Sequence, residues 1–270
     1  MKFAINYSPQ AEQLEKDGTI HVDVFKCPSW DDLVPRVHQS HPAYVHFSFI
    51  AGRNQLDDVD LDWVEHWLDT TDTLVINTHL AVCEDDFTNG KAVSVEGIIE
   101  KVVRDVEFFG KRFGNERVIV ENIPYPDPGW QDGLLKECVD PAVISQIVEQ
   151  TGCGLLLDVA HAIRACEGLG ETDIKSYLNA MPVHALRELH VVGILPEVDK
   201  DGVRQDHYEL LESDWEMVEF SIEQLRAKKW HEPDVMAFEY GGVGPLFENR
   251  SESSIIAEQA SRLYQLAQSV

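Results

Sequence analysis

The sequence predicts an α/β protein with the (β/α)8 TIM-barrel fold. Eight short apolar segments recur along the 270 residues, and helical patterns lie between them. Connections from a predicted helix to the next strand are short, whereas those from a strand to the next helix are long. Strands that alternate with helices form a parallel sheet, and at this length they favour one barrel domain over residues 1–270.

The predicted strands are runs of apolar and β-branched residues bounded by polar turns, which is typical of buried strands. No linker, repeat or low-complexity tract divides the chain. The strands are expected at residues 3–6, 21–25, 44–49, 73–80, 117–122, 154–159, 188–192 and 234–240.

Several helices carry recognisable start signals. Apolar residues repeat at helical spacing over 95–106 and again over 256–263. Asp140-Pro141 predicts an N-cap followed by proline at the first helical position. Residues 213–216 (SDWE) predict a capping box, and the acidic run 57–62 is typical of a solvated helix start.

The long connections are predicted to lie on one rim of the barrel. They cover residues 49–59, 80–92, 122–137 and 193–212. In a TIM barrel these loops follow the carboxyl ends of the strands, where active sites are built. The functional site is therefore expected at the C-terminal rim.

Histidine and carboxylate side chains stand at the ends of the predicted strands or in the loops that follow. Asp158 ends the apolar run 155–157, and a buried carboxylate is costly unless a cation or a metal ion partners it. The barrel would direct the whole set toward one rim. The set consists of His46, His79, Glu121, Asp158, His161, His190, Asp206, His207 and Glu239.

This set of five imidazoles and four carboxylates predicts a metal site. It carries too much negative charge to gather without cations, and mixed imidazole and carboxylate ligands suit Zn, Fe or Mn. Bridging carboxylates would let two or three ions share the site. Taken singly, each residue has an ordinary alternative: His46 as a core histidine, Asp158 as a turn cap or partner of Arg164, and Asp206-His207 as part of a solvated loop.

The composition of the chain limits the kinds of partner and the cell compartment that we expect. The formal net charge is −26 and the pI is about 4.6, so nucleic acid is not expected as a partner. The five cysteines form no CxxC pair, which is typical of a reducing cytoplasm. The N-terminal residues lack the apolar stretch of a signal peptide, and no apolar run is long enough to span a membrane. We therefore expect a cytoplasmic protein without a membrane partner.

Six segments resemble the DUF692 family of multinuclear non-heme iron-dependent oxidative enzymes, which are related to methanobactin biosynthesis enzymes. They are FAINYSP, ENIPYP, LLLDVAHA, ELHVVG, DHYELLESDW and FEYGG. The resemblance covers nearly the whole chain. It implies a TIM barrel, two or three iron ions held by the nine residues above, and the use of O₂ to modify cysteine-containing ribosomal peptides. It also implies a separate peptide-recognising partner protein.

An oxidase of this kind would close the loop 193–212 over its substrate. Asp206 and His207 are then the candidate catalytic residues, because ligands on a loop can join or leave a metal ion during turnover. Tyr7, Tyr125, Tyr208 and Tyr240 lie near the predicted rim, where they could line a substrate pocket or pack within the loops.

The sequence is also compatible with a redox-inert metalloenzyme. Better-known DUF692 members carry asparagine-rich sequence after the strand-end aspartate, whereas this chain has Ala160-His161. The resulting Asp-x-x-His pair resembles the wider xylose-isomerase-like superfamily, which includes endonuclease IV. That likeness implies zinc or manganese with a sugar isomerase, epimerase or phosphodiesterase activity. A non-enzymatic metal store is the third alternative.

Overall fold

A computed structural model describes residues 1–56, 58–87, 93–129, 133–245, 247 and 250–270. The chain divides into two compact units, which are treated one at a time. Unit 1 comprises Met1–His46, Thr71–Thr73 and Arg187–Val270, and unit 2 comprises Phe47–Thr70 and Leu74–Leu186. The single domain expected over 1–270 stays a prediction.

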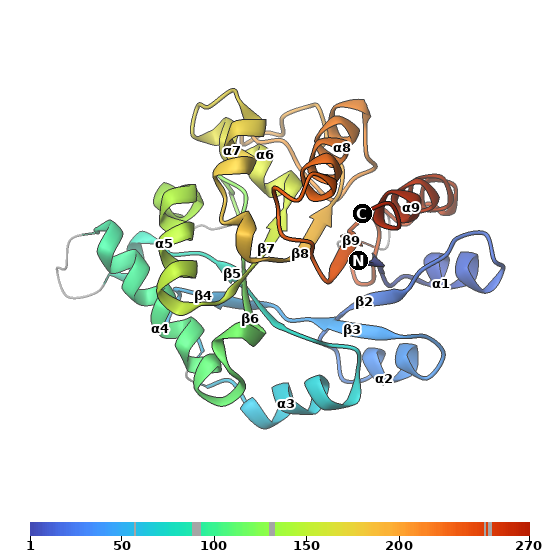
Figure 1. Ribbon diagram of the computed structural model, residues 1–270, viewed down its shortest axis with the longest axis horizontal. Coiled ribbons are helices and arrows are strands. Elements are labelled where there is room, and N and C mark those ends of the chain that lie inside the picture. The colour runs from blue at the N-terminus through green and yellow to red at the C-terminus, as the bar shows by residue number, and fades with distance from the viewer. Residues whose placement is uncertain (57, 88–92, 130–132, 246, 248–249) are drawn as a thin grey trace. The chain divides into compact units, whose positions relative to one another are not determined.

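Unit 1 brings the two ends of the chain into one parallel sheet, because the first strand pairs with the last (Figure 1). Its strand order is β3-β2-β1-β9-β8. Its strands are β1 (Lys2–Asn6), β2 (Val24–Pro28), β3 (Ala43–His46), β8 (Leu186–Val191) and β9 (Val235–Phe238). Its helices are α1 (Pro9–Lys16), α2 (Leu33–His38), α8 (Glu212–Arg226) and α9 (Ser253–Ala267).

Unit 2 contains parallel strands in the order β7-β6-β5-β4. They are β4 (Phe49–Ala51), β5 (Ile76–Leu80), β6 (Val118–Glu121) and β7 (Gly154–Asp158). Two of its helices, α4 and α5, pack against each other (Figure 1). Its helices are α3 (Leu61–Thr70), α4 (Val95–Phe113), α5 (Pro141–Thr151), α6 (Val159–Gly168) and α7 (Ile174–Ala180), with 3-10 turns η1 (Glu84–Asp86), η2 (Asn115–Arg117), η3 (Lys136–Val139) and η4 (Val183–Ala185).

The described residues form nine strands rather than the eight predicted, because the segment 44–49 makes two. β3 ends at His46 and β4 begins at Phe49. The side chain of Asn77 accepts a hydrogen bond from the Phe47 amide (2.7 Å) and donates one to the Phe47 carbonyl (2.8 Å). A side-chain amide thus takes both main-chain groups that Phe47 would use in a regular ladder, so the strand is interrupted after His46.

The helix starts are mostly as predicted. Asp140 caps α5, and its carboxylate accepts from the Ala142 amide (2.8 Å). The predicted cap at Ser213 is wrong, because α8 already begins at Glu212 and Leu211 is its N-cap. Asp214 supplies the reciprocal contact, accepting from the Leu211 amide (2.8 Å). Of the acidic run 57–62, residue 57 lies outside the described residues, and Asp60 caps the start of α3.

The parallel strands explain how the polar residues are positioned. In unit 2, His79 of β5 is paired in register with Glu121 of β6, and Asp158 is the last residue of β7. In unit 1, His190 of β8 is paired with Ala237, and Glu239 directly follows β9. Parallel strands end at the same edge of their sheet, so each unit presents its polar residues at that edge.

Candidate metal centre

The nine predicted ligands divide between the two units. Unit 2 holds two carboxylates that are almost completely buried, Glu121 (1% exposed) and Asp158 (0%). One ligand atom from each of Glu121, Asp158 and His161 lies within 4.8 Å of the others. Burial of two carboxylates so close together requires compensating positive charge. The remaining ligand of this unit is His79; unit 1 holds His46, His190, Asp206, His207 and Glu239.

His161 is oriented as a metal-binding imidazole would be. Its Nδ1 lies 2.9 Å from the Asn122 carbonyl, so Nδ1 carries the proton and donates. Its Nε2 then faces Asp158 Oδ2 at 3.8 Å. The other oxygen of Asp158 caps helix α6 by accepting from the His161 amide (2.8 Å). Asp158 therefore serves as the cap that was the ordinary alternative, and it keeps a second oxygen beside the imidazole.

Asn122 holds this arrangement from behind. Its side chain donates to the Asp158 carbonyl (2.9 Å) and accepts from the Asp158 amide (2.9 Å). The same residue thus supports the main chain of Asp158 and the ring of His161. Groups in this outer position commonly fix the orientation of metal ligands.

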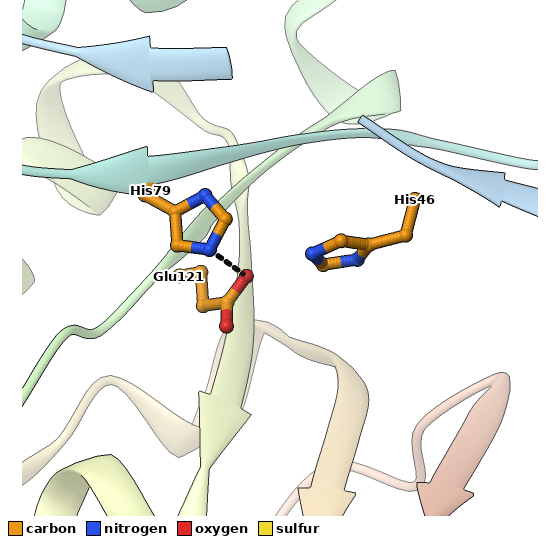
Figure 2. A group of neighbouring side chains, drawn as sticks. All are labelled: His46, His79 and Glu121. Carbon is orange, nitrogen blue, oxygen red and sulfur yellow. Dashed lines mark ion pairs between the residues drawn. The ribbon is translucent and has the colours of Figure 1, made fainter. Parts of the chain in front are cut away.

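The ring of His79 is oriented in the same way as that of His161. Its Nδ1 lies 3.3 Å from the Phe49 carbonyl, and its Nε2 lies 3.4 Å from Glu121 Oε2. Figure 2 shows the ring of His79 turned toward the Glu121 carboxylate, with the dashed line marking this ion pair. The imidazole again directs Nδ1 toward main chain and Nε2 toward a carboxylate.

His207 of unit 1 is a third example. Its Nδ1 is 3.4 Å from the Glu239 carbonyl, and its Nε2 is 3.9 Å from Asp206 Oδ1. The backbone of His207 has φ +62°, a left-handed conformation that is uncommon outside glycine and that clusters at functional sites.

His190 is held differently. Its Nε2 lies 2.7 Å from Glu188 Oε1 and its Nδ1 lies 3.1 Å from Glu239 Oε1. Tyr44 donates its hydroxyl to the same Glu188 oxygen (2.6 Å), and the ammonium of Lys26 pairs closely with Glu239 Oε1. All five side chains are buried.

The pKa values in this group follow from these contacts. Burial by itself would lower the pKa of His190, but Glu239 and the hydrogen bond to Glu188 outweigh it and raise that pKa to about 10. Burial would raise the pKa of Glu239, yet His190 and Lys26 hold it well below its usual range. Burial and Glu188 raise the pKa of Tyr44 well above its ordinary value. The contacts with His190 and Lys26 therefore favour the ionised form of Glu239 although that carboxylate is buried.

His46 belongs to the same unit as this group. Its ring lies 5.3 Å from that of His190, centroid to centroid. Ligand atoms of His46, Glu188 and His190 lie within 4.8 Å of one another.

Sequence reasoning missed Lys26, Tyr44, Glu188 and the supporting role of Asn122. Glu188 could have been found, since it precedes His190 by two residues on one strand and so shares its face. Lys26 offered a weaker signal as a single charge inside the apolar run Val24–Pro28.

A further cluster in unit 2 contains Cys83, Asp85 and Asp86, whose ligand atoms also lie within 4.8 Å of one another. Here Arg53 supplies positive charge, with Nε 3.1 Å from Asp86 and Nη2 3.5 Å from Asp85. Its Nη1 also contacts Cys83 Sγ at 2.6 Å. This cluster is better explained as an ion-pair network than as a metal site.

Unit 1 also contains a cavity of about 400 Å³, and one of its lining residues, Tyr208, directly follows Asp206 and His207 in the sequence. Two of the tyrosines expected near a pocket, Tyr208 and Tyr240, line it. Arg250 lines it as well: its guanidinium stacks over the Tyr208 ring at 4.3 Å and donates to the Asp206 carbonyl (3.3 Å).

Comparison with known proteins places the chain in a family. Residues 30–229 match the family described as RiPP precursor modification enzyme MbnB/TglH/ChrH. The chain belongs to this family. This is the DUF692 family that the sequence segments resemble, so that prediction is confirmed. A protein of Caulobacter vibrioides named UPF0276 protein is 37% identical over 82 residues, which cover 30% of this chain and 27% of that protein.

Solved structures show the fold. A xylose isomerase domain containing protein of Salmonella typhimurium aligns over 99% of this chain and 97% of its own with TM-score 0.58 and 15% identity. A family 2 AP endonuclease of Brucella melitensis aligns over 96% and 98%, with TM-score 0.58 and 13% identity. The predicted TIM-barrel fold class is confirmed. Family and ligand clusters together support a metal-dependent enzyme.

Among the described residues, none of the helices combines the length and the apolar character needed to cross a bilayer.

Proposed function

We propose that the protein is a non-heme iron-dependent oxidase that uses two or three iron ions to modify a peptide or another small substrate. The observation that carries the proposal is the repeated orientation of His79, His161 and His207. Each ring directs Nδ1 toward a main-chain carbonyl and Nε2 toward a carboxylate. Metal-binding histidines are characteristically held by a hydrogen bond from the second nitrogen, so the donor set fits metal ions.

The ligand chemistry is compatible with iron. Imidazole and carboxylate side chains suit iron, manganese and zinc; zinc has no redox chemistry, whereas iron changes oxidation state and can use O₂. In unit 2, Glu121, Asp158, His161 and His79 would hold metal; in unit 1, His46, His190, Asp206, His207 and Glu239 would do so. The rings of His161 and His79 are oriented without a metal ion, because the main-chain carbonyls of Asn122 and Phe49 accept their Nδ1 protons.

We propose a ribosomally made peptide as substrate, in keeping with the family description. The cavity lined by Tyr208, Tyr240 and Arg250 is the candidate place for part of that peptide, since aromatic rings and a guanidinium contact peptide groups well. A separate partner protein that recognises the peptide is part of the proposal. No nucleic acid partner is expected, because the net charge is −26.

Asp206 and His207 are the proposed catalytic residues. They lie on the loop between β8 and α8 rather than on a strand, so a small loop movement changes their distance from a bound ion or substrate. Their role would be to complete the ligand set when substrate is bound. A His207→Ala variant would keep most of its metal and lose turnover.

The decisive experiment is to purify the protein without oxygen, measure its metal content by mass spectrometry, and then follow O₂ consumption with candidate peptides. Two or three irons per chain, and O₂ consumption coupled to a mass change in the peptide, would support the proposal. Zinc or manganese with no O₂ consumption would refute it.

The second candidate is a redox-inert metalloenzyme, either a sugar isomerase or epimerase or a phosphodiesterase. The observation that favours it is the Asp158–His161 pair, in which the aspartate caps the helix that carries the histidine. Activity with manganese or zinc, independent of O₂, would support this alternative. Phosphodiester substrates fit the net charge of −26 poorly.

A further inference from the structure

The strongest unexplained feature is a lysine buried among candidate metal ligands. Lys26 of β2 is 6% exposed, and its ammonium pairs closely with Glu239, which is 3% exposed. Buried lysines are rare unless they are paired. Here the partner is Glu239, a carboxylate that the proposed function assigns to a metal ion.

We infer that Lys26 is a built-in cation that competes with a metal ion for Glu239 and so limits how many ions the protein holds. This inference rests on the proposed metal binding. It concerns the same carboxylate oxygen, since Glu239 Oε1 contacts both the Lys26 ammonium and His190 Nδ1.

The fold holds Lys26 in this place. Lys26 is in register with Asn6 of β1 and with Tyr44 of β3. Asn6 donates to the main-chain carbonyls of Glu239 (3.0 Å) and Gly241 (3.1 Å), so the residue that Lys26 contacts is fixed through its backbone.

The neighbouring hydrogen bonds fix the other side of the group. Tyr44 donates to Glu188, and the same Glu188 oxygen contacts His190 Nε2. His190 is thereby held with Nδ1 toward Glu239 Oε1 (3.1 Å). The lysine, the two glutamates, the tyrosine and the histidine form one connected network inside unit 1.

Electrostatics then gives the direction of the effect. A divalent ion bound at His190 Nδ1 and Glu239 would lie beside the Lys26 ammonium, in a buried environment where like charges repel strongly. Either the ion displaces the ammonium from Glu239 or the ammonium keeps the ion out. In both cases Lys26 weakens metal binding at this position.

The test compares the wild-type protein with Lys26→Met, which removes the charge and keeps a side chain of similar length. Lys26→Arg keeps the charge, and Lys200→Met removes a lysine whose side chain is 90% exposed. Each protein is loaded with Fe(II) without oxygen; the ions bound per chain are counted by mass spectrometry, and affinity is measured by competition with a chelator.

Lys26→Met is expected to hold about one more ion per chain than the wild type, or to bind its weakest ion with an affinity about tenfold higher. The reason is that one positive charge next to the ion has been removed. Lys26→Arg and Lys200→Met should match the wild type. Equal or lower stoichiometry and affinity in a folded Lys26→Met protein would overturn the inference.

A second measurement covers the case in which Lys26→Met does not fold. In a crystal structure of the iron-loaded wild type, any ion bound by Glu239 should leave Lys26 unpaired from that carboxylate, and an intact Lys26–Glu239 pair should coincide with no ion there. An ion and Lys26 together on Glu239 would refute the inference. Wild-type protein that takes up iron while Lys26→Met is unchanged contradicts only the role of Lys26; absence of uptake by both refutes the proposed function as well.

Discussion

The two units place their acidic residues beside different partners. In unit 1 the carboxylates Glu188 and Glu239 contact a tyrosine, a histidine and a lysine of the same unit. In unit 2 Glu121 contacts His79 and His161, and one oxygen of Asp158 faces the His161 ring. Imidazoles can share a metal ion with a carboxylate, whereas an ammonium can only replace that ion.

Burial of a carboxylate is not by itself the mark of a metal site. Glu188 and Glu121 are both buried at strand positions, yet the first is bonded to a tyrosine hydroxyl and the second faces imidazole nitrogens. We therefore expect unit 2 to dominate metal affinity and unit 1 to adjust it.

The largest effect is expected from the carboxylates of unit 2. Glu121→Gln and Asp158→Asn should each lower metal affinity by about 100-fold or more, since a ligand charge is lost outright. Asparagine still accepts the hydrogen bond that caps α6, so Asp158→Asn should remain folded. Metal content and circular dichroism of both variants test this, with Glu149→Gln on the exposed face of α5 as the control. Unchanged metal content would remove unit 2 from the metal site.

A smaller loss is expected at Asn122, which supports ligands without being one. Asn122→Ala removes both side-chain hydrogen bonds to the Asp158 main chain. Metal affinity should fall by about 10- to 100-fold, as is usual for outer-shell partners. Chelator competition measures the effect. If Asn122→Ala binds metal as the wild type does, the position of Asp158 does not depend on these two hydrogen bonds.

Glu188 provides the matched contrast to Glu121. Glu188→Gln keeps an oxygen that can accept from Tyr44 and loses the charge beside His190. We expect a loss of about 1 to 3 kcal/mol in the free energy of unfolding, because a buried charged hydrogen bond is weakened. Metal content should change far less than in Glu121→Gln. Denaturant unfolding and metal analysis of the two variants side by side test this. Loss of metal from Glu188→Gln would show that Glu188 is itself needed for metal binding.

The smallest effect on metal is expected at the cavity. Arg250→Met removes the guanidinium that stacks on Tyr208. With a peptide substrate, KM should rise by about tenfold, the loss of one charged hydrogen bond, while metal content stays constant. Steady-state kinetics tests this with Lys229→Met, an exposed lysine, as control. An unaltered KM would show that the peptide binds elsewhere.

Much of the fold and of unit 2 could be predicted from the chain alone. The strand-end positions of Glu121 and Asp158 follow from apolar runs that stop at a polar residue, and the cap at Asp140 follows from its proline. The break after His46 could not be predicted, since it depends on Asn77, a residue on another strand. The same holds for the start of α8, where Asp214 rather than Ser213 makes the capping contact.

The sequence by itself determined the alternation of strands and helices and the family, because both reside in local patterns and motifs. It also determined which residue types stand at the strand ends. Only the tertiary structure decided how each ring is turned and what each carboxylate contacts. Lys26 and Glu239 are separated by more than two hundred residues and become partners only because β1 joins β2 to β9. Partnerships of this kind depend on strand order and register, which no local pattern contains.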